Sequence, residues 1–216
     1  MSDREWIEQY MDANGGKYIQ ANDDIWAYAE LAFKEVKSAA RLEQMLRDEG
    51  FAVETGVAGI PTCFTGTWSQ GSGKPVMGIL GEYDALAALS QEAGSAVKRE
   101  TVPGGAGHGC GHCALGTGSL AAAVAVKEYL RETGRDGTVI YFGCPAEEGA
   151  GSKQFMARAG VFEGVDFVYT WHPATVNEVE AGHSNAIMGA NFYFKGISSH
   201  AGSTPFLGRS ALDACE

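Results

Sequence analysis

The spacing of apolar residues predicts that the first fifty residues are mainly helical. Between residues 36 and 49, Val36, Ala39, Ala40, Leu42 and Leu46 recur at helical intervals. Gly50 follows them and is suited to the C-terminal cap, where a left-handed backbone is common. A helix is therefore expected over residues 36–49.

Short apolar runs after residue 50 predict strands separated by helices. The strands are expected at residues 51–53, 62–68, 76–80, 138–142 and 167–171. The unbroken apolar run at 76–80 is typical of a strand buried on both faces. Helices are expected at 115–131, ending near Gly134, and around 153–159. This alternation predicts an α/β sheet with parallel crossovers.

The pattern changes after His172, where a new module is expected. Residues 186–195 are predicted to be extended and to begin this second module. The organisation expected is therefore a first domain over residues 1–180 and the start of another over 181–216.

Composition narrows the function classes. Apolar residues make up 45% of the 216 residues, enough for a sizeable core. Sixteen basic against 27 acidic residues give a net charge of -11, which argues against a nucleic acid or an anionic membrane as partner. No basic segment leads into an apolar stretch at the N-terminus, and no apolar run is long enough to cross a bilayer. A cytoplasmic protein is expected.

Cysteine usage favours reduced thiols. The five cysteines are an odd number and are widely scattered, so a disulfide framework is not expected.

Metal-binding side chains follow the predicted strands. Glu82 and Asp84 follow the strand at 76–80, Glu147 and Glu148 follow the strand at 138–142, and His172 ends the strand at 167–171. Because ligands collect beyond the carboxyl ends of strands in an open α/β sheet, these side chains are expected at one edge.

Cys110 and His112 are expected at the same edge, because they precede the helix that returns from it. Cysteine, histidine and glutamate are zinc-ligand types, and a free carboxylate serves as a base. Singly, each has a structural explanation as a buried thiol, a solvated carboxylate or a hydrogen-bonded histidine. Their convergence favours a metal site.

A dithiol oxidoreductase is the rival hypothesis, because Cys110 and Cys113 form a C-x-x-C pattern opening a helix. Against it, a long glycine-rich segment at 101–109 precedes Cys110 where the dithiol pattern has a strand. It also leaves the paired glutamates without a role.

Five stretches carry a resemblance to a known family. They are GEYDAL at 81–86, GHGCGH at 107–112, GCP and EEG within 143–149, TWHP at 170–173 and GRSALDA at 208–214. In these stretches the chain resembles the aminoacylase/carboxypeptidase-type metallo-amidohydrolases. The resemblance implies part of a three-layer α/β metallopeptidase-like catalytic domain, followed by the start of an α+β lid or dimerisation domain, in the N-terminal part of a longer chain.

The resemblance also implies a site for two divalent ions, manganese or zinc. Its ligands in this chain would be Cys110, His112, Glu148 and His172. Glu147 would be the general base that deprotonates the attacking water and later protonates the departing amine.

Further roles follow from the same resemblance. Asp84 would orient a ligand without touching the metal. His200 would come from the lid and stabilise the oxyanion, often in a neighbouring subunit's site. Glu82 stands where many relatives have a histidine and has no assigned role, while His108 and His183 are expected to be structural or solvent-facing. Cys113 stands where relatives carry Asn or Asp, at a position expected to cap the helix, and is either without consequence or an added soft ligand.

The implied activity is hydrolysis of the amide bond of an N-acyl amino acid. The favoured substrate is p-aminobenzoyl-glutamate, a folate breakdown product; dipeptides and other N-acyl amino acids are alternatives. A homodimer, or a complex with a related subunit, would form through the lid. A non-catalytic metal-binding subunit or an inactive fragment is the alternative of another class.

Overall fold

A computed structural model describes residues 2–149, 151–179, 182–183 and 185–216. The chain separates into two compact units, Met1–Thr175 and Val176–Glu216. The boundary expected at 180/181 falls on residues outside the described part.

The first unit is built on a five-stranded sheet with the order β1-β2-β4-β3-β5. The strands are β1 (Ala52–Thr55), β2 (Phe64–Gln70), β3 (Val76–Gly81), β4 (Gly137–Gly143) and β5 (Phe167–Tyr169). β3 is parallel to both β4 and β5, which confirms the predicted crossovers. β2 pairs antiparallel with β1 and with β4, so the sheet is mixed.

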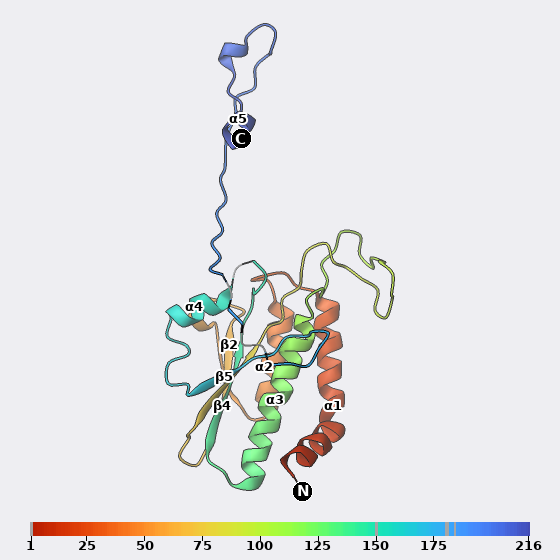
Figure 1. Ribbon diagram of the computed structural model, residues 1–216, viewed down its shortest axis with the longest axis vertical. Helices are drawn as coiled ribbons and strands as arrows, with labels where there is room; N and C mark the ends of the chain where they lie inside the picture. Colours follow the sequence, from red (N-terminus) through yellow and green to blue (C-terminus); the bar gives the residue numbers. More distant parts are fainter. Residues whose placement is uncertain (1, 150, 180–181, 184) are drawn as a thin grey trace. The chain divides into compact units, whose positions relative to one another are not determined.

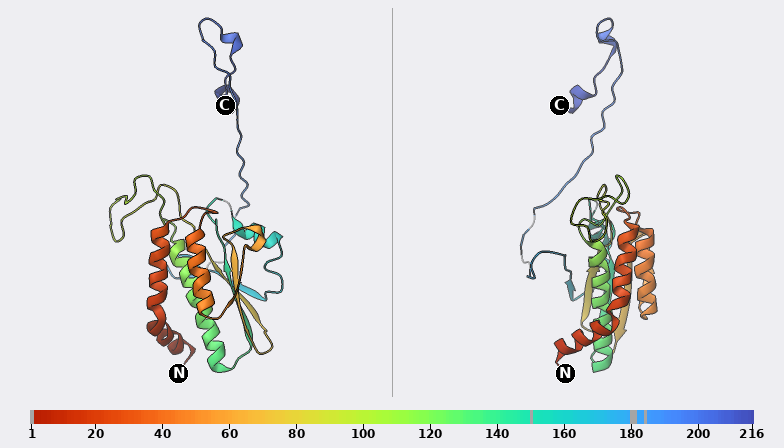
Figure 2. Two further views of the ribbon diagram at one scale, coloured as in Figure 1. Left: turned by 180° about the vertical axis from the view of Figure 1, so that it is seen from behind. Right: turned by 90° about the vertical axis from the view of Figure 1, so that its right-hand side faces the viewer.

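Helices cover both faces of this sheet (Figure 1). α1 (Asp3–Tyr28), α2 (Val36–Asp48) and α3 (His112–Thr133) lie on one face, and the further views show the same grouping (Figure 2). α4 (Ser152–Arg158) lies on the opposite face, near the short 3₁₀ helix η1 (Val57–Gly59). No helix in the described ranges combines the length and apolarity needed to span a membrane.

The central strand β4 shows why the unit has three layers. Val139 and Tyr141 belong to the large cluster beneath α1, α2 and α3. Phe142 belongs to a second cluster with Met156 of α4. Alternate residues of a strand point to opposite faces, so β4 is buried on both.

α2 differs in detail from its predicted apolar face. Ala39, Leu42 and Leu46 are buried as expected, but Val36 and Ala40 are exposed. At about 100° per residue, Ala40 lies on the opposite side of the helix from the stripe of buried residues, which is formed by Ser38, Ala39, Leu42, Met45 and Leu46. Val36 opens the helix in its first turn.

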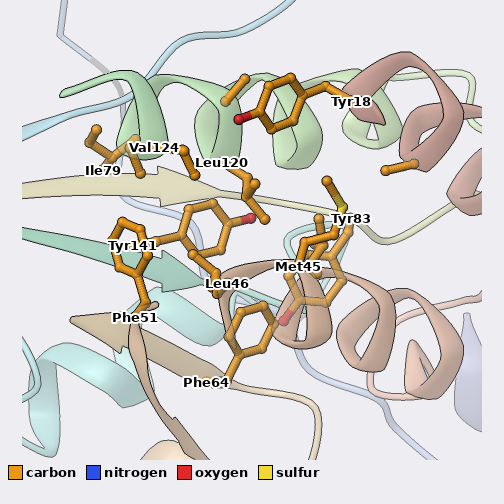
Figure 3. Packing of buried hydrophobic residues seen from close by; sticks show 14 of the residues in the cluster. Tyr18, Met45, Leu46, Phe51, Phe64, Ile79, Tyr83, Leu120, Val124 and Tyr141 are labelled. Carbon is orange, nitrogen blue, oxygen red and sulfur yellow. The ribbon is translucent and has the colours of Figure 1, made fainter. Parts of the chain in front are cut away.

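Aromatic rings fill the core below the carboxyl ends of the strands (Figure 3). The Phe64 ring lies 5.8 Å from the rings of both Tyr83 and Tyr141. The strand-ending Gly81 and Gly143 make room for them: a Cβ at Gly81 would lie 2.1 Å from the Tyr141 hydroxyl, and one at Gly143 would lie 2.4 Å from the Phe64 ring. The last residues of β3 and β4 must therefore lack a side chain.

The second unit contains little regular structure. It has a bridge between Ile197 and Arg209, the 3₁₀ helix η2 (Pro205–Leu207) and the short α5 (Leu212–Cys215). Residues 186–195, predicted to be extended, form no assigned strand. Ile187 and Met188 in this segment are almost fully exposed.

The packing of α2 on β2 gives a first testable prediction. A Cβ at Gly66 would lie 2.8 Å from a methyl group of the buried Leu46. Gly66→Ala should therefore lower the free energy of unfolding by about 1–3 kcal/mol through overpacking. Leu46→Ala should cost about 2–5 kcal/mol through a cavity.

The double variant is the control for direct contact. Leu46→Ala opens the space that the new methyl group needs. The double variant should therefore lose about 0.5–3 kcal/mol less unfolding free energy than the two single variants lose together. Urea unfolding measures all three variants. Strict additivity would contradict the contact.

Candidate metal centre

The site forms at the edge where the parallel strands end. Glu82 and Asp84 follow β3, Glu147 and Glu148 follow β4, and His112 is the first residue of α3. β3 lies between β4 and β5, so the segments leaving these strands are neighbours. Predicted site residues that are far apart in the sequence thus meet in one place.

Two groups of donor atoms share His112. Cys110, His112 and His172 each place a donor within 4.8 Å of the others, and so do Glu82, His112 and Glu147. The Cys110 Sγ lies 3.2 Å from the His172 Nε2. The rings of His112 and His172 are nearly perpendicular, with centroids 5.7 Å apart.

A buried carboxylate fixes the orientation of His112. Asp84 Oδ1 lies 3.0 Å from the His112 Nδ1, which donates to it, and Asp84 Oδ2 accepts the Glu148 backbone N–H at 2.9 Å. Both Asp84 and His112 are almost inaccessible to solvent. With the proton on Nδ1, the lone pair of Nε2 is available to a cation, the usual arrangement for a metal-binding histidine.

The His112 Nε2 atom tests whether the residues fit a metal ion. It is buried and has no hydrogen-bond partner within the described part of the chain. The Glu82 Oε2 atom is 3.1 Å away, without hydrogen-bond geometry. A buried polar atom without a partner is costly, and here it faces thiol, imidazole and carboxylate donors. The donor set therefore fits a divalent cation.

The ionisation of the site reflects its surroundings. Burial, and then the facing Glu148 and Glu147 carboxylates, raise the pKa of the Cys110 thiol to about 11. Burial alone would lower the pKa of His112, but the hydrogen bond and charge of Asp84 raise it. A bound cation would lower the pKa of the Cys110 thiol instead, because a thiol that coordinates a metal is deprotonated.

Glu82 has a partner that the sequence did not reveal. Its side chain is buried beside His112, and the Lys153 ammonium of α4 forms an ion pair with its Oε1 atom. Lys153 stands in a predicted short helix, and its sequence context gives no sign of this contact.

The adjacent glutamates lie in different surroundings. Glu147 is exposed and belongs to the group with Glu82 and His112. Glu148 is half-buried, and its carboxylate faces Cys110. It belongs to neither group of donors found in the described residues. The predicted division into a base and a ligand stays a prediction.

Cys113 does not cap α3, so that prediction is wrong. The cap is Gly111, at φ +80°, because the helix begins two residues earlier than a cap at 113 requires. Cys113 is packed in the core and belongs to neither donor group in the described residues. Burial raises the pKa of this thiol as well as that of Cys110, whereas a dithiol oxidoreductase needs a depressed pKa.

The other histidines lie outside the donor groups. His108 is structural, with its Nε2 3.0 Å from the Ile25 carbonyl oxygen. His183 and His200 belong to the second unit, and both are exposed. The His200 Nδ1 accepts the backbone N–H groups of Gly202 and Ser203, each at 3.1 Å. Its role at the oxyanion stays a prediction.

The fold and the donor set together define the class of metallopeptidase-like α/β domains. Residues 78–188 match the model of peptidase family M20/M25/M40. The chain belongs to this family.

Curated relatives and solved structures extend the comparison. The chain is 46% identical to one subunit of the p-aminobenzoyl-glutamate hydrolase of Escherichia coli (strain K12), over 97% of this chain and 43% of the relative. It is 31% identical to the Xaa-Arg dipeptidase of Mus musculus, over 88% of this chain and 42% of the relative. The chain thus spans less than half of the length of these relatives.

A solved structure supports the fold. The YXEP protein of Bacillus subtilis, described as a dinuclear metal binding peptidase from the M20 family, superposes with a TM-score of 0.59 at 22% identity, over 80% of this chain and 44% of that chain.

Cysteine alkylation gives a second prediction. Among the free thiols, Cys215 is exposed, Cys110 is partly exposed, and the remaining three, Cys63, Cys113 and Cys144, are buried. A maleimide should label Cys215 first and Cys110 more slowly, and it should spare the buried thiols. Added manganese or zinc should slow labelling at Cys110, because a metal-bound thiolate is not free to react.

Peptide mass spectrometry measures each site, and Cys215 is the control within the same chain. Equal slowing at Cys215, or unchanged labelling of Cys110 at saturating metal, would contradict the metal centre.

Proposed function

We propose that this protein hydrolyses the amide bond of an N-acyl amino acid with the help of two divalent ions, manganese or zinc. Cys110, His112, Glu148 and His172 are the proposed ligands. The observation that carries the proposal is the buried His112 Nε2, which has no hydrogen-bond partner among the described residues and lies beside the Cys110 and His172 donors. Membership of a peptidase family supports the same reaction class.

The chemistry divides between the metal and the protein. Divalent ions bound there supply Lewis acidity toward an amide carbonyl and a water molecule. Glu147 is exposed at the site and free of hydrogen bonds from the protein among the described contacts, so its carboxylate is available to accept a proton from the attacking water. The same carboxyl group then protonates the departing amine nitrogen.

Asp84 and His200 are assigned supporting roles. Asp84 holds His112 in the ligating tautomer and fixes the backbone of Glu148 at the same time. His200 is proposed to stabilise the developing oxyanion, with the second unit serving as part of a lid or dimerisation domain.

The favoured substrate is p-aminobenzoyl-glutamate, on the strength of the 46% identical relative. Dipeptides and other N-acyl amino acids are the second choice, because a dipeptidase is also among the relatives. Since the first relative is named as a subunit, we propose a homodimer or a complex with a related subunit. We also propose a cytoplasmic location, which the odd number and wide scatter of the cysteines support. A metal-binding subunit without turnover is the alternative of another class.

The third prediction separates the two glutamates. In the full-length protein, Glu147→Gln should lower kcat by about 10²–10⁴-fold, because the amide cannot carry the proton, and should keep the metal content. Glu148→Ala should lose metal as well as activity, because it removes a ligand. Release of p-aminobenzoate and elemental analysis measure the two effects.

Glu54→Gln is the matched control, because Glu54 is an exposed residue of β1. This variant should change neither kcat nor the metal content. Retained turnover in Glu147→Gln, or equal metal loss in both site variants, would overturn the division of roles.

A further inference from the structure

The linker between α1 and α2 contacts both loops that carry acidic site residues. The Glu30 carbonyl oxygen accepts the Ala85 N–H at 2.8 Å, directly after Asp84. The Glu35 Oε1 atom accepts the Ala146 N–H at 2.8 Å, directly before Glu147. One short segment, far from both loops in the sequence, therefore bonds to each of them.

Glu35 is an unusual residue for this position. Its side chain is fully buried, and within the described ranges no lysine or arginine pairs with it. Its carboxylate instead accepts from neutral donors: Ala146 N–H and Phe33 N–H at Oε1, and the Thr62 hydroxyl at Oε2, at 2.8, 2.9 and 3.0 Å. Burying a carboxylate is costly unless its hydrogen bonds are satisfied, and here both oxygens are bonded.

The two backbone donors to Oε1 have strained conformations. Phe33 has φ +61° and Ala146 has φ +55°, in the left-handed region that residues other than glycine rarely adopt. Such a conformation persists only where the surroundings stabilise it. The Glu35 Oε1 atom thus stabilises two left-handed residues, Phe33 in the linker between α1 and α2 and Ala146 in the turn before Glu147.

We propose that Glu35 is a positioning residue that fixes the turn presenting Glu147 and Glu148 at the metal centre. This inference rests on the proposed function, because it assumes that these glutamates act in the reaction. The Ala146 carbonyl oxygen also accepts the Gly151 N–H at 2.8 Å, so the turn is bonded at its first residue on both the N–H and the C=O side. Loss of the Glu35 bond releases the turn without removing any donor to the metal.

Four variants of the full-length protein separate positioning from simple burial. Glu35→Gln keeps the contacts, because its amide oxygen accepts both N–H groups and its NH₂ group donates to the Thr62 hydroxyl. Glu35→Asp keeps the charge but shortens the reach. Glu35→Ala removes every contact, and Thr62→Val removes only the bond at Oε2.

Kinetics are the first readout. At saturating metal, Glu35→Ala and Glu35→Asp should lower kcat by about 10–100-fold, with KM within about threefold of wild type. Metal affinity should fall less than in Glu148→Ala, because the Glu148 carboxylate is displaced and not removed. Glu35→Gln and Thr62→Val should keep kcat within about threefold of wild type.

Amide hydrogen exchange is the second readout and does not depend on activity. The peptide over residues 143–149 should exchange faster in Glu35→Ala and Glu35→Asp, and at the wild-type rate in Glu35→Gln and Thr62→Val. If Glu35→Ala does not fold, the Asp and Gln variants still decide the question.

Wild-type exchange and kcat in Glu35→Asp would overturn the proposal, and so would a loss in Glu35→Gln as large as that in Glu35→Asp. Failure of the proposed function would show separately, as retained turnover in Glu147→Gln. The exchange measurement still tests the turn in that case.

Discussion

The hydrogen bonds of Asp84 are the constraint on which the site depends. One carboxylate oxygen fixes the His112 ring at the start of α3, and the other fixes the Glu148 backbone after β4. Because Asp84 itself follows β3, a single buried side chain ties together segments from three elements. Each of these bonds also favours the ionised carboxylate, so that, against the effect of burial, the pKa of Asp84 is lowered.

The charge of the site has the sign that a cation needs. The carboxylates of Glu82, Asp84, Glu147 and Glu148 lie around the His112 imidazole, and Lys153 pairs with Glu82 alone. Such a cluster repels itself when no cation is present. The positive end of the α3 helix dipole lies at the same place, and it offsets only part of that repulsion.

The sequence predicts where the site lies better than it predicts the residues that hold the site in place, such as Glu35 and Lys153. Strand runs followed by Glu82, Glu147 and His172 were sufficient, since parallel strands present their carboxyl ends together. Contacts between residues far apart in the sequence have no comparable pattern in the sequence. Glu35 and Lys153 resemble surface residues of their helices, and only the tertiary packing buries one and pairs the other. The antiparallel position of β2 between β1 and β4, and the start of α3 at His112 after the Gly111 cap, depend likewise on packing and backbone conformation.

The length of α3 couples the metal centre to the folding of the whole first unit. The helix runs 22 residues from His112 to Thr133, and most of its first 14 residues are buried. At 1.5 Å per residue the helix is about 33 Å long, and its N-terminal part lies in the core. His112, a proposed metal ligand at the first residue of this long packed helix, cannot move independently of it. An ion bound at the proposed centre would therefore be linked thermodynamically to global unfolding, and the melting temperature of the unit would rise with the free metal concentration.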